Sequence, residues 1–291
     1  MTQDQSRVDT TLDIWLPPIE RILERALPRP VVLGLVEFLV FGIKQAWACL
    51  FGGLILAAIL ISAWVWPEQA SVSRYDALFV FAIAVQATFL MTRLERPSEA
   101  LVILIFHVVG TVMEIFKTEV GSWTYPEDNL LRIGGVPLFS GFMYAAVGSY
   151  LARASRVFEF TWTDYPNRLA TLALSVLIYV NFFTHHWTYD IRWALFAVTA
   201  FLFWRTQVHY RVWRWHHRMP LLLGFFLISV FLWIAENVGT VTRTWMYPEQ
   251  VAGWQMVSLS KMGSWYLLMI ISFVLVTLVH KPVPRGAAPD S

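Results

Sequence analysis

The sequence predicts an all-α, polytopic integral membrane protein of about eight transmembrane helices, arranged as two parallel four-helix repeats with both termini in the cytoplasm. Its composition is 57% hydrophobic and only 14% charged, with a mean hydropathy of +0.55, whereas soluble domains carry about a quarter charged residues. Fifteen tryptophans fit a membrane protein, because these amphipathic rings collect at the membrane–water interfaces. The small net charge of +2 argues against a nucleic-acid partner.

Residues 1–30 are predicted to form a cytoplasmic tail that contains an interfacial amphipathic helix. In "IERILERAL" the apolar residues Ile19, Ile22, Leu23 and Ala26 share one helical face, and charged residues surround the rest. Such a helix lies in the plane of the membrane surface. Residues 31–44 either continue this helix or form an outer turn of the first span.

Apolar segments of the length needed to cross a bilayer, roughly 17 to 25 residues, follow eight times. They cover residues 46–66, 75–91, 99–116, 136–151, 169–183, 191–204, 221–238 and 262–280. With eight spans both tails share one side, and that side, with the even-numbered loops, holds 16 of the 22 lysines and arginines. Because positive charge stays cytoplasmic, we expect a multi-pass protein of the bacterial inner membrane whose odd-numbered loops face outward.

The division into two repeats comes from a phrase that the chain contains twice. The sequences "EIFKTEVGSWTYPE" (114–127) and "ENVGTVTRTWMYPE" (236–249) begin with the same acid and end with the same tetrad, 122 residues apart. The predicted units are 31–155 and 156–285, followed by a tail at 286–291. A unit with an even number of spans keeps its orientation when duplicated, so both phrases are expected on the outer face.

Glu114 and Glu236, which begin the two phrases, are the candidate catalytic residues. In a structural interpretation, each carboxyl accepts hydrogen bonds from the backbone or the tryptophan of the loop after its own helix. In a functional interpretation, the two carboxyls line one shared cavity, because an acid within a membrane segment usually faces a partner or a wet space. Burial could then hold one acid protonated beside an ionised partner.

Aromatic and histidine side chains on the same outer side are the candidate ligand-binding residues. They are Trp123, Tyr125, Trp245, Tyr247, His185 and His186. The four aromatic residues fit either an interfacial belt or a stacking wall for an unsaturated ligand. The adjacent histidines point about 100° apart on a helix, so no metal site is predicted. Motifs of nucleotide-driven chemistry and serine hydrolysis are absent from the sequence, and no cofactor is identified.

The stretch "VVGTVMEIFKTEVGSWTYPEDNLLRIGGVPLFSGFMY" (108–144) resembles two groups of proteins. Over nearly its full length the chain resembles a bacterial multi-pass family of unknown function, often called YoaT-like, which implies no activity. The stretch itself is similar to the membrane-embedded carotenoid hydratases and heterodimer-type lycopene cyclases. Their pattern of a glutamate, a Gly-x-aromatic-x-Tyr and a Gly-Val-Pro is matched by Glu114, Gly121, Tyr125 and residues 135–137. The second copy has Arg243 at the glycine and lacks Gly-Val-Pro.

The second resemblance implies chemistry on a polyene within the bilayer. Glu114 would be the proton donor, since protonating an alkene needs a positioned acid shielded from water. Trp123 and Tyr125 would stabilise the developing cation through their π faces, and Glu236 would orient a water molecule or balance charge.

Three functions follow from these features. The first is binding or modification of an isoprenoid or other lipid in an outward-facing cavity that uses the paired glutamates. The second is proton-coupled secondary transport, which the parallel repeat favours. The third is a structural role in the membrane without small-molecule chemistry. The expected partners are the lipid bilayer and an apolar ligand.

Overall fold

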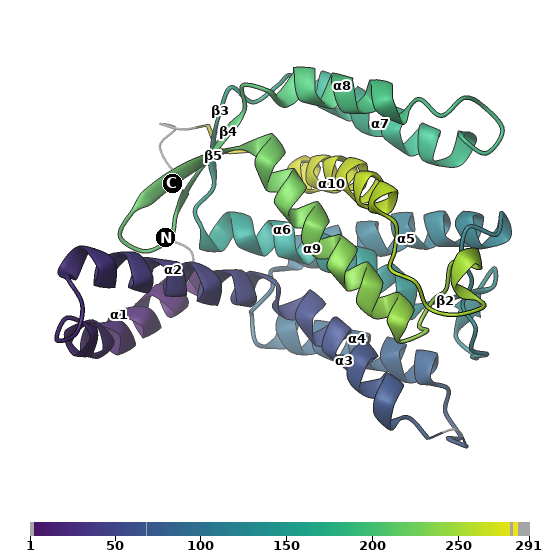
Figure 1. Ribbon diagram of the computed structural model, residues 1–291, viewed down its shortest axis with the longest axis horizontal. Helices are drawn as coiled ribbons and strands as arrows, with labels where there is room; N and C mark the ends of the chain where they lie inside the picture. Colours follow the sequence, from purple (N-terminus) through teal and green to yellow (C-terminus); the bar gives the residue numbers. More distant parts are fainter. Residues whose placement is uncertain (1–2, 68, 280–281, 285–291) are drawn as a thin grey trace.

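The computed structural model describes residues 3–67, 69–279 and 282–284. These residues form ten α-helices and two small antiparallel sheets (Figure 1). The helices are α1 (Gln3–Leu23), α2 (Arg29–Ala48), α3 (Leu50–Val65), α4 (Arg74–Met91), α5 (Pro97–Glu119), α6 (Phe139–Val157), α7 (Arg168–Thr184), α8 (Arg192–Phe203), α9 (Leu221–Val241) and α10 (Leu259–Val279). The chain is therefore mostly helical, and the prediction of an all-α fold needs correction for the sheets.

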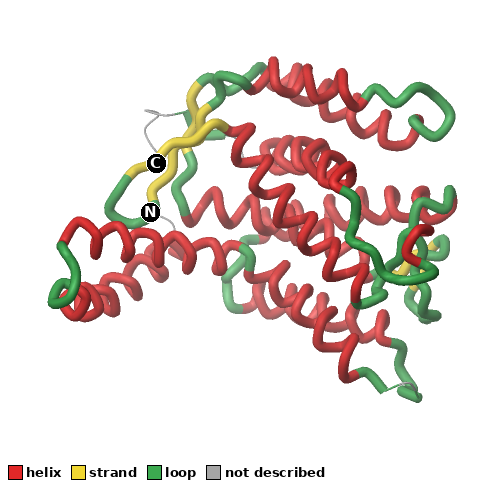
Figure 2. The backbone as a smooth tube through the Cα atoms, in the orientation of Figure 1, coloured by secondary structure: helices red, strands yellow, loops and turns green. Residues whose placement is uncertain are grey.

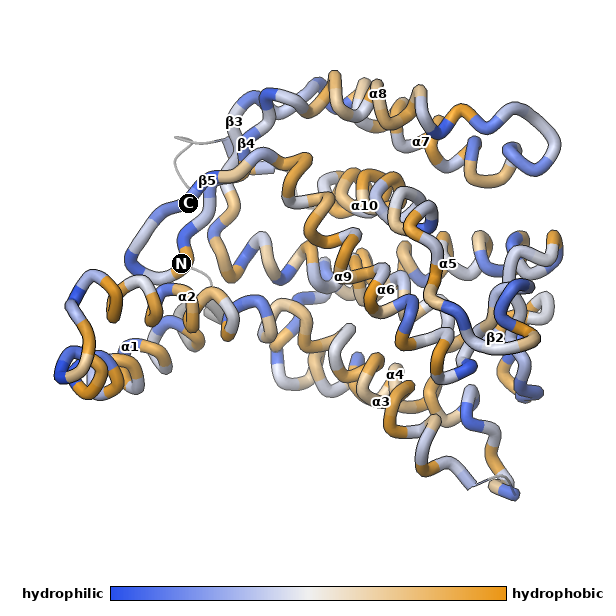
Figure 3. Tube along the Cα trace, viewed as in Figure 1, coloured by the Kyte–Doolittle hydropathy of each residue, from blue (hydrophilic) through white to orange (hydrophobic). Residues whose placement is uncertain are grey.

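Each of the eight predicted spans corresponds to one helix, from α3 to α10. Residue 280 of the last span and the predicted tail at 286–291 lie outside the described residues. Hydrophobic residues are concentrated in the helices and hydrophilic ones in the loops (Figure 3). Among the described residues, α2, α4, α5, α9 and α10 are long and apolar enough to cross a membrane, while α3, α7 and α8 are apolar but shorter.

Residues 29–48 form a helix of their own, α2. The chain leaves the helical conformation at Cys49 (φ −81°, ψ 2°) and begins α3 at Leu50. The predicted boundary at residue 46 therefore lies within α2. Helix α2 packs against α1 and α6, and it is neither a continuation of the predicted surface helix nor an extra turn of the first span.

The sixth of the predicted loops, which includes the basic segment 205–218, is not irregular but forms most of a β-hairpin. Strands β4 (Gln207–Arg211) and β5 (His216–Pro220) pair antiparallel, and β3 (Thr161–Thr163) adds the third strand to give the order β3-β4-β5. Val208, the second residue of β4, is buried between polar neighbours, as the period-2 geometry of a strand allows. Figure 2 shows the strands at one end of a helical body.

Charged side chains attach α1 to this end of the molecule. The Lys44 ammonium in α2 lies 2.8 Å from an oxygen of Asp9, and the indole of Trp213 donates to Asp13 at 2.9 Å. The exposed apolar side chains of Ile14 and Trp15 leave α1 an apolar face. The amphipathic helix is thus present but ends at Leu23, earlier than the pattern around residues 19–26 predicts.

The two repeated phrases lie at the end opposite the three-stranded sheet. Helix α5 packs against α6, α9 packs against α10, and α6 contacts α10 between them. Beyond α5 lie β1 (Arg132–Ile133) and β2 (Val136–Pro137), and beyond α9 lies the 3-10 turn η1 (Pro248–Gln250). In Figure 1, β2 and the chain before α10 lie together, away from β3–β5.

Candidate functional site

Helices α5 and α9 end with the same turn. Gly121 (φ 73°) and Arg243 (φ 53°), which are 122 residues apart, both adopt the left-handed conformation directly after the helix. The next residue then donates its backbone N–H to a carbonyl five residues earlier, from Ser122 to Lys117 at 2.8 Å and from Thr244 to Gly239 at 2.9 Å. This is the Schellman arrangement, in which glycine is usual. The arginine in the second phrase therefore keeps the turn of the first.

Each turn leads a tryptophan and a tyrosine back onto the glutamate of its own helix. One oxygen of Glu114 accepts from the Trp123 indole and from the Tyr125 hydroxyl, both at 2.7 Å. The other oxygen accepts from the Tyr144 hydroxyl of α6 at 2.6 Å. The Glu114 side chain is buried, so these three donors take the place of water.

Glu236 has an equivalent set of partners. One oxygen accepts from the Trp245 indole at 2.8 Å and from the Tyr247 hydroxyl at 2.6 Å, and the indole of Trp265 in α10 lies near this carboxyl. Burial, followed by the charge of Glu236, raises the pKa of Tyr247 well above its usual value. The phenol therefore stays protonated and donates. These contacts are those of the structural interpretation, in which each acid holds its own loop.

The two phrases pair with each other. The backbone N–H of Thr124 donates to the carbonyl of Met246 at 2.9 Å, and the N–H of Met246 donates to Thr124 at the same distance. The rings of Trp123 and Tyr247 meet edge to face, 6.2 Å apart. Both phrases therefore emerge at the same end of the molecule, and their carboxyls lie close enough to interact electrostatically.

Glycines allow the aromatic side chains to lie against the helices. A Cβ at Gly239, one turn after Glu236, would lie closer than 3.0 Å to three carbons of the Trp245 ring. In the same way, a Cβ at Gly110 of α5 would overlap the ring of Tyr144. Real side chains do not show such contacts, so only glycine leaves room for these rings.

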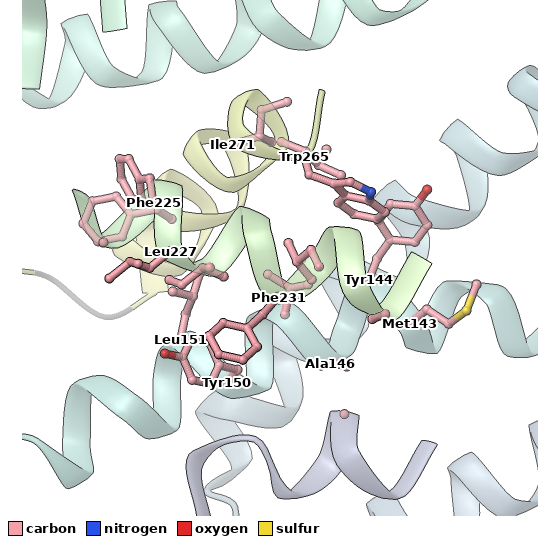
Figure 4. Close-up of a pocket in the computed structure, with 18 of the residues that line it drawn as sticks. Met143, Tyr144, Ala146, Tyr150, Leu151, Phe225, Leu227, Phe231, Trp265 and Ile271 are labelled. Atoms are coloured by element: carbon pink, nitrogen blue, oxygen red, sulfur yellow. The ribbon is translucent and has the colours of Figure 1, made fainter. Parts of the chain in front are cut away.

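A cavity of about 1190 Å³ lies beside the paired phrases. Its wall includes Glu114, Glu236 and all four predicted aromatic residues, and elsewhere it is mostly apolar. Figure 4 shows part of the lining, with Met143, Tyr144, Ala146, Tyr150 and Leu151 of α6, Phe225, Leu227 and Phe231 of α9, and Trp265 and Ile271 of α10. Tyr144 and Trp265 lie side by side, with ring centroids 6.2 Å apart. The cavity exceeds the roughly 300–1,000 Å³ of ordinary small-molecule pockets.

His185 and His186, in the turn after α7, line the same cavity. Nδ1 of His185 is hydrogen-bonded to the backbone carbonyl of Asn181 at 2.9 Å. Nε2 of His186 lies 2.8 Å from the ammonium of Lys117. Within the described part of the chain, no group of three or more His, Cys, Asp or Glu residues could hold a metal ion.

The predicted set omitted several residues that line the site. Tyr144 and Trp265 contact the two carboxyls from α6 and α10. Lys117 and Arg192 lie on the cavity wall with Lys261. The ungapped alignment of the two phrases continues as far as Tyr144 and Tyr266, a signal that could have added Tyr144. It would have given Tyr266 in place of its neighbour Trp265.

The composition, the five apolar helices and the cavity together indicate a helical membrane protein that contains a large, mostly apolar cavity. Residues 37–273 match the family described as "Protein of unknown function (DUF817)", and the chain belongs to this family. It is 43% identical over 236 residues to the "Uncharacterized protein YoaT" of Bacillus subtilis (strain 168). The aligned region covers 81% of this chain and 89% of the relative.

No solved structure matches the chain. The family match and the relative confirm the YoaT-like family that the sequence predicts. The similarity to carotenoid hydratases and lycopene cyclases stays a prediction, because neither the family match nor the relative bears on it.

Proposed function

We propose that the protein is a multi-pass protein of the bacterial inner membrane that binds an isoprenoid or another lipid in its cavity. The observation that carries the proposal is the position of two buried carboxyls, Glu114 and Glu236, on the wall of one large, mostly apolar space. Binding sites for apolar ligands have this character, with many hydrophobic groups and a few fixed polar ones. The paired carboxyls would orient the ligand.

The proposal includes the duplication and the orientation. The two matching turns and the reciprocal pairing of Thr124 with Met246 support the two repeat units, 31–155 and 156–285. The first helix and residues 282–284 both lie at the sheet end, where Trp162 donates to the carbonyl of Val283 at 3.1 Å. Most of the basic residues belong to the tails and loops assigned to this end, and positive charge stays cytoplasmic. The paired phrases at the opposite end would therefore face outward.

The arrangement also offers acid chemistry. Glu114 and Glu236 lie on the wall where a bound double bond would meet them, and the aromatic rings beside them have faces that stabilise positive charge. Proton transfer from Glu114 to a polyene would use these groups as the resemblance implies. Binding comes first in this proposal, and modification of the ligand is its extension.

Proton-coupled transport is the second candidate. One feature favours it: the cavity lining continues from the paired phrases to the sheet end, where Trp162, Tyr210 and Val283 contribute to it. A path with residues of both ends on its wall fits passage of a solute better than storage of a ligand.

The test of binding is lipid analysis of the purified protein in a mild detergent. We expect one apolar species to co-purify in excess over bulk phospholipid, and to be lost from the variants Glu114→Gln and Glu236→Gln. The matched control is Glu37→Gln, a buried glutamate of α2 that accepts from the backbone of Trp213 at 3.1 Å and does not line the cavity.

Equal lipid content in all four proteins, or bulk phospholipid alone, would contradict lipid binding. Uptake of a solute into proteoliposomes that depends on a pH gradient and is lost in Glu114→Gln would favour transport instead. If both glutamate variants only lower the melting temperature, with neither ligand nor flux detected, the structural interpretation stands.

A further inference from the structure

Three cationic side chains from different elements lie on the cavity wall near the paired phrases. They are Lys117 of α5, Arg192 of α8 and Lys261 of α10. Each of the three interacts electrostatically with one or both of the others. Positive charges repel at short range, so a cluster of this kind needs a compensating charge.

Lys117 is buried without a carboxylate partner. It is 4% exposed, and among the described residues no carboxylate lies within salt-bridge distance of its ammonium. Its neighbours are Nε2 of His186 at 2.8 Å and the ring of Phe182 at 4.2 Å. A buried lysine is rare in proteins unless it is paired, and an ammonium has three donors.

Lys261 and Arg192 complete the cluster. The ammonium of Lys261 lies 4.1 Å from the centroid of the Tyr247 ring and 5.9 Å from that of Trp123, so it lies where the two phrases meet. Glu236, Glu249, Arg192 and Lys117 all interact electrostatically with it. The guanidinium of Arg192 lies 2.7 Å from Asp190. Asp190 is thus the one acid in direct contact with any of the three cations within the described chain.

Neither lysine has a counterpart in the other copy of the repeat. The residue 122 positions after Lys117 is Gly239, and the residue 122 positions before Lys261 is Phe139. The turn after α9 and the partners of Glu236 form without a lysine at the equivalent place. The lysines are therefore not required by the shared architecture of the phrases.

The state of His186 agrees with positive charge gathered around Lys117. Partial desolvation and then the charge of Lys117 lower the pKa of His186. A neutral imidazole can accept at Nε2, and the lysine can only donate. The histidine thus accommodates Lys117 but does not neutralise it.

We propose that Lys117, Lys261 and Arg192 bind a phosphate or carboxylate group, the anionic end of an amphiphile whose apolar chain lies in the cavity. The proposal rests on the lipid-binding function proposed above and names the class of ligand. The three cations provide charge-assisted hydrogen bonds, and the adjoining wall of α6, α9 and α10 is apolar (Figure 4). The anion would enter at the paired phrases, with its chain directed toward the sheet.

The experiment compares farnesyl phosphate with farnesol on the purified full-length protein, with inorganic phosphate as a third probe. We expect farnesyl phosphate to bind at least about tenfold more tightly than farnesol, since hydrogen bonds to charged groups are the stronger ones. Lys117→Gln and Lys261→Gln should each remove most of that difference. Lys44→Gln, which changes a buried lysine outside the cavity, is the matched control.

Each outcome is decisive for one of the two proposals. Equal affinity for the two prenyl compounds would overturn the anion site and leave lipid binding in place. A different outcome is that the wild type binds inorganic phosphate but neither prenyl compound, and that Lys117→Gln loses the phosphate. That result would support the anion site for a soluble ligand and overturn lipid binding. Binding of none of the probes would overturn both. Should the lysine variants fail to fold, Arg192→Gln, whose side chain is partly exposed, supplies the same comparison.

Discussion

Replacing Gly239 with alanine should unfold the site that holds Glu236. The added Cβ would overlap the Trp245 ring, and such overpacking costs about 1–3 kcal/mol. If the indole moves away, its hydrogen bond to Glu236 is lost as well, which for a charged acceptor costs about 1.5–3 kcal/mol. Against these losses, alanine gains about 0.5–1 kcal/mol in a helix interior.

The net expectation for Gly239→Ala is a loss of about 2–4 kcal/mol, or a melting temperature lower by about 5–10 °C for a chain of this size. The assay is thermal unfolding in detergent, followed by tryptophan fluorescence. The matched control is Gly34→Ala in α2, where nothing lies within 4 Å of the new Cβ, and it should stabilise slightly. Equal effects of the two substitutions would refute the reasoning that Trp245 lies against the helix.

Two further predictions concern the paired phrases and His186. The first uses a chain whose single cysteine, Cys49, is changed to serine. In this background the double variant Thr124→Cys/Met246→Cys should form a disulfide, because directly paired strand residues lie about 5.5 Å apart at Cα. The single variants are the controls, and failure of the double variant to form the disulfide on mild oxidation would contradict the pairing. The depressed pKa of His186 means that its contribution to stability is full above the unfolded pKa and is lost as pH falls through the folded one. The wild type should therefore lose more melting temperature between pH 7 and pH 5 than His186→Gln, whose amide still accepts from Lys117, and parallel profiles would contradict this.

The helices could largely be predicted from the sequence, because long apolar runs bounded by charged or turn residues leave few alternatives. The predicted segments 75–91 and 221–238 lie within three residues of α4 and α9. The boundary between α2 and α3 could not be predicted, since residues 46–54 continue the apolar run without a proline and the break at Cys49 has no local signal. A helix end set only by tertiary packing leaves no trace in periodicity.

The three-stranded sheet was missed because its charge was more prominent than its pattern. In "QVHYR" β-branched and aromatic residues alternate with polar ones, which is a strand signal. The four arginines of 205–218 are equally typical of a loop at the membrane surface. The strand β3 that completes the sheet lies about 45 residues earlier, and no local pattern links the two.

At the site, the partners of the acids within each phrase could be predicted, and those from other helices could not. Trp123 and Tyr125 follow Glu114 at a spacing repeated in the second phrase, so their shared contact was a reasonable expectation. Tyr144 reaches Glu114 from the next helix, and Lys117 is one turn beyond the acid. The direction of such side chains depends on how α5 and α6 pack, which no single segment encodes.

The backbone pairing of the two phrases uses only main-chain groups of Thr124 and Met246. Neither side chain is needed for it, so substitutions at these two positions can accumulate without separating the halves. If the two units arose by duplication, as proposed above, one copy could in this way gain Lys117 while the other kept Gly239. The backbone pairing would stay constant while the side chains around it diverge.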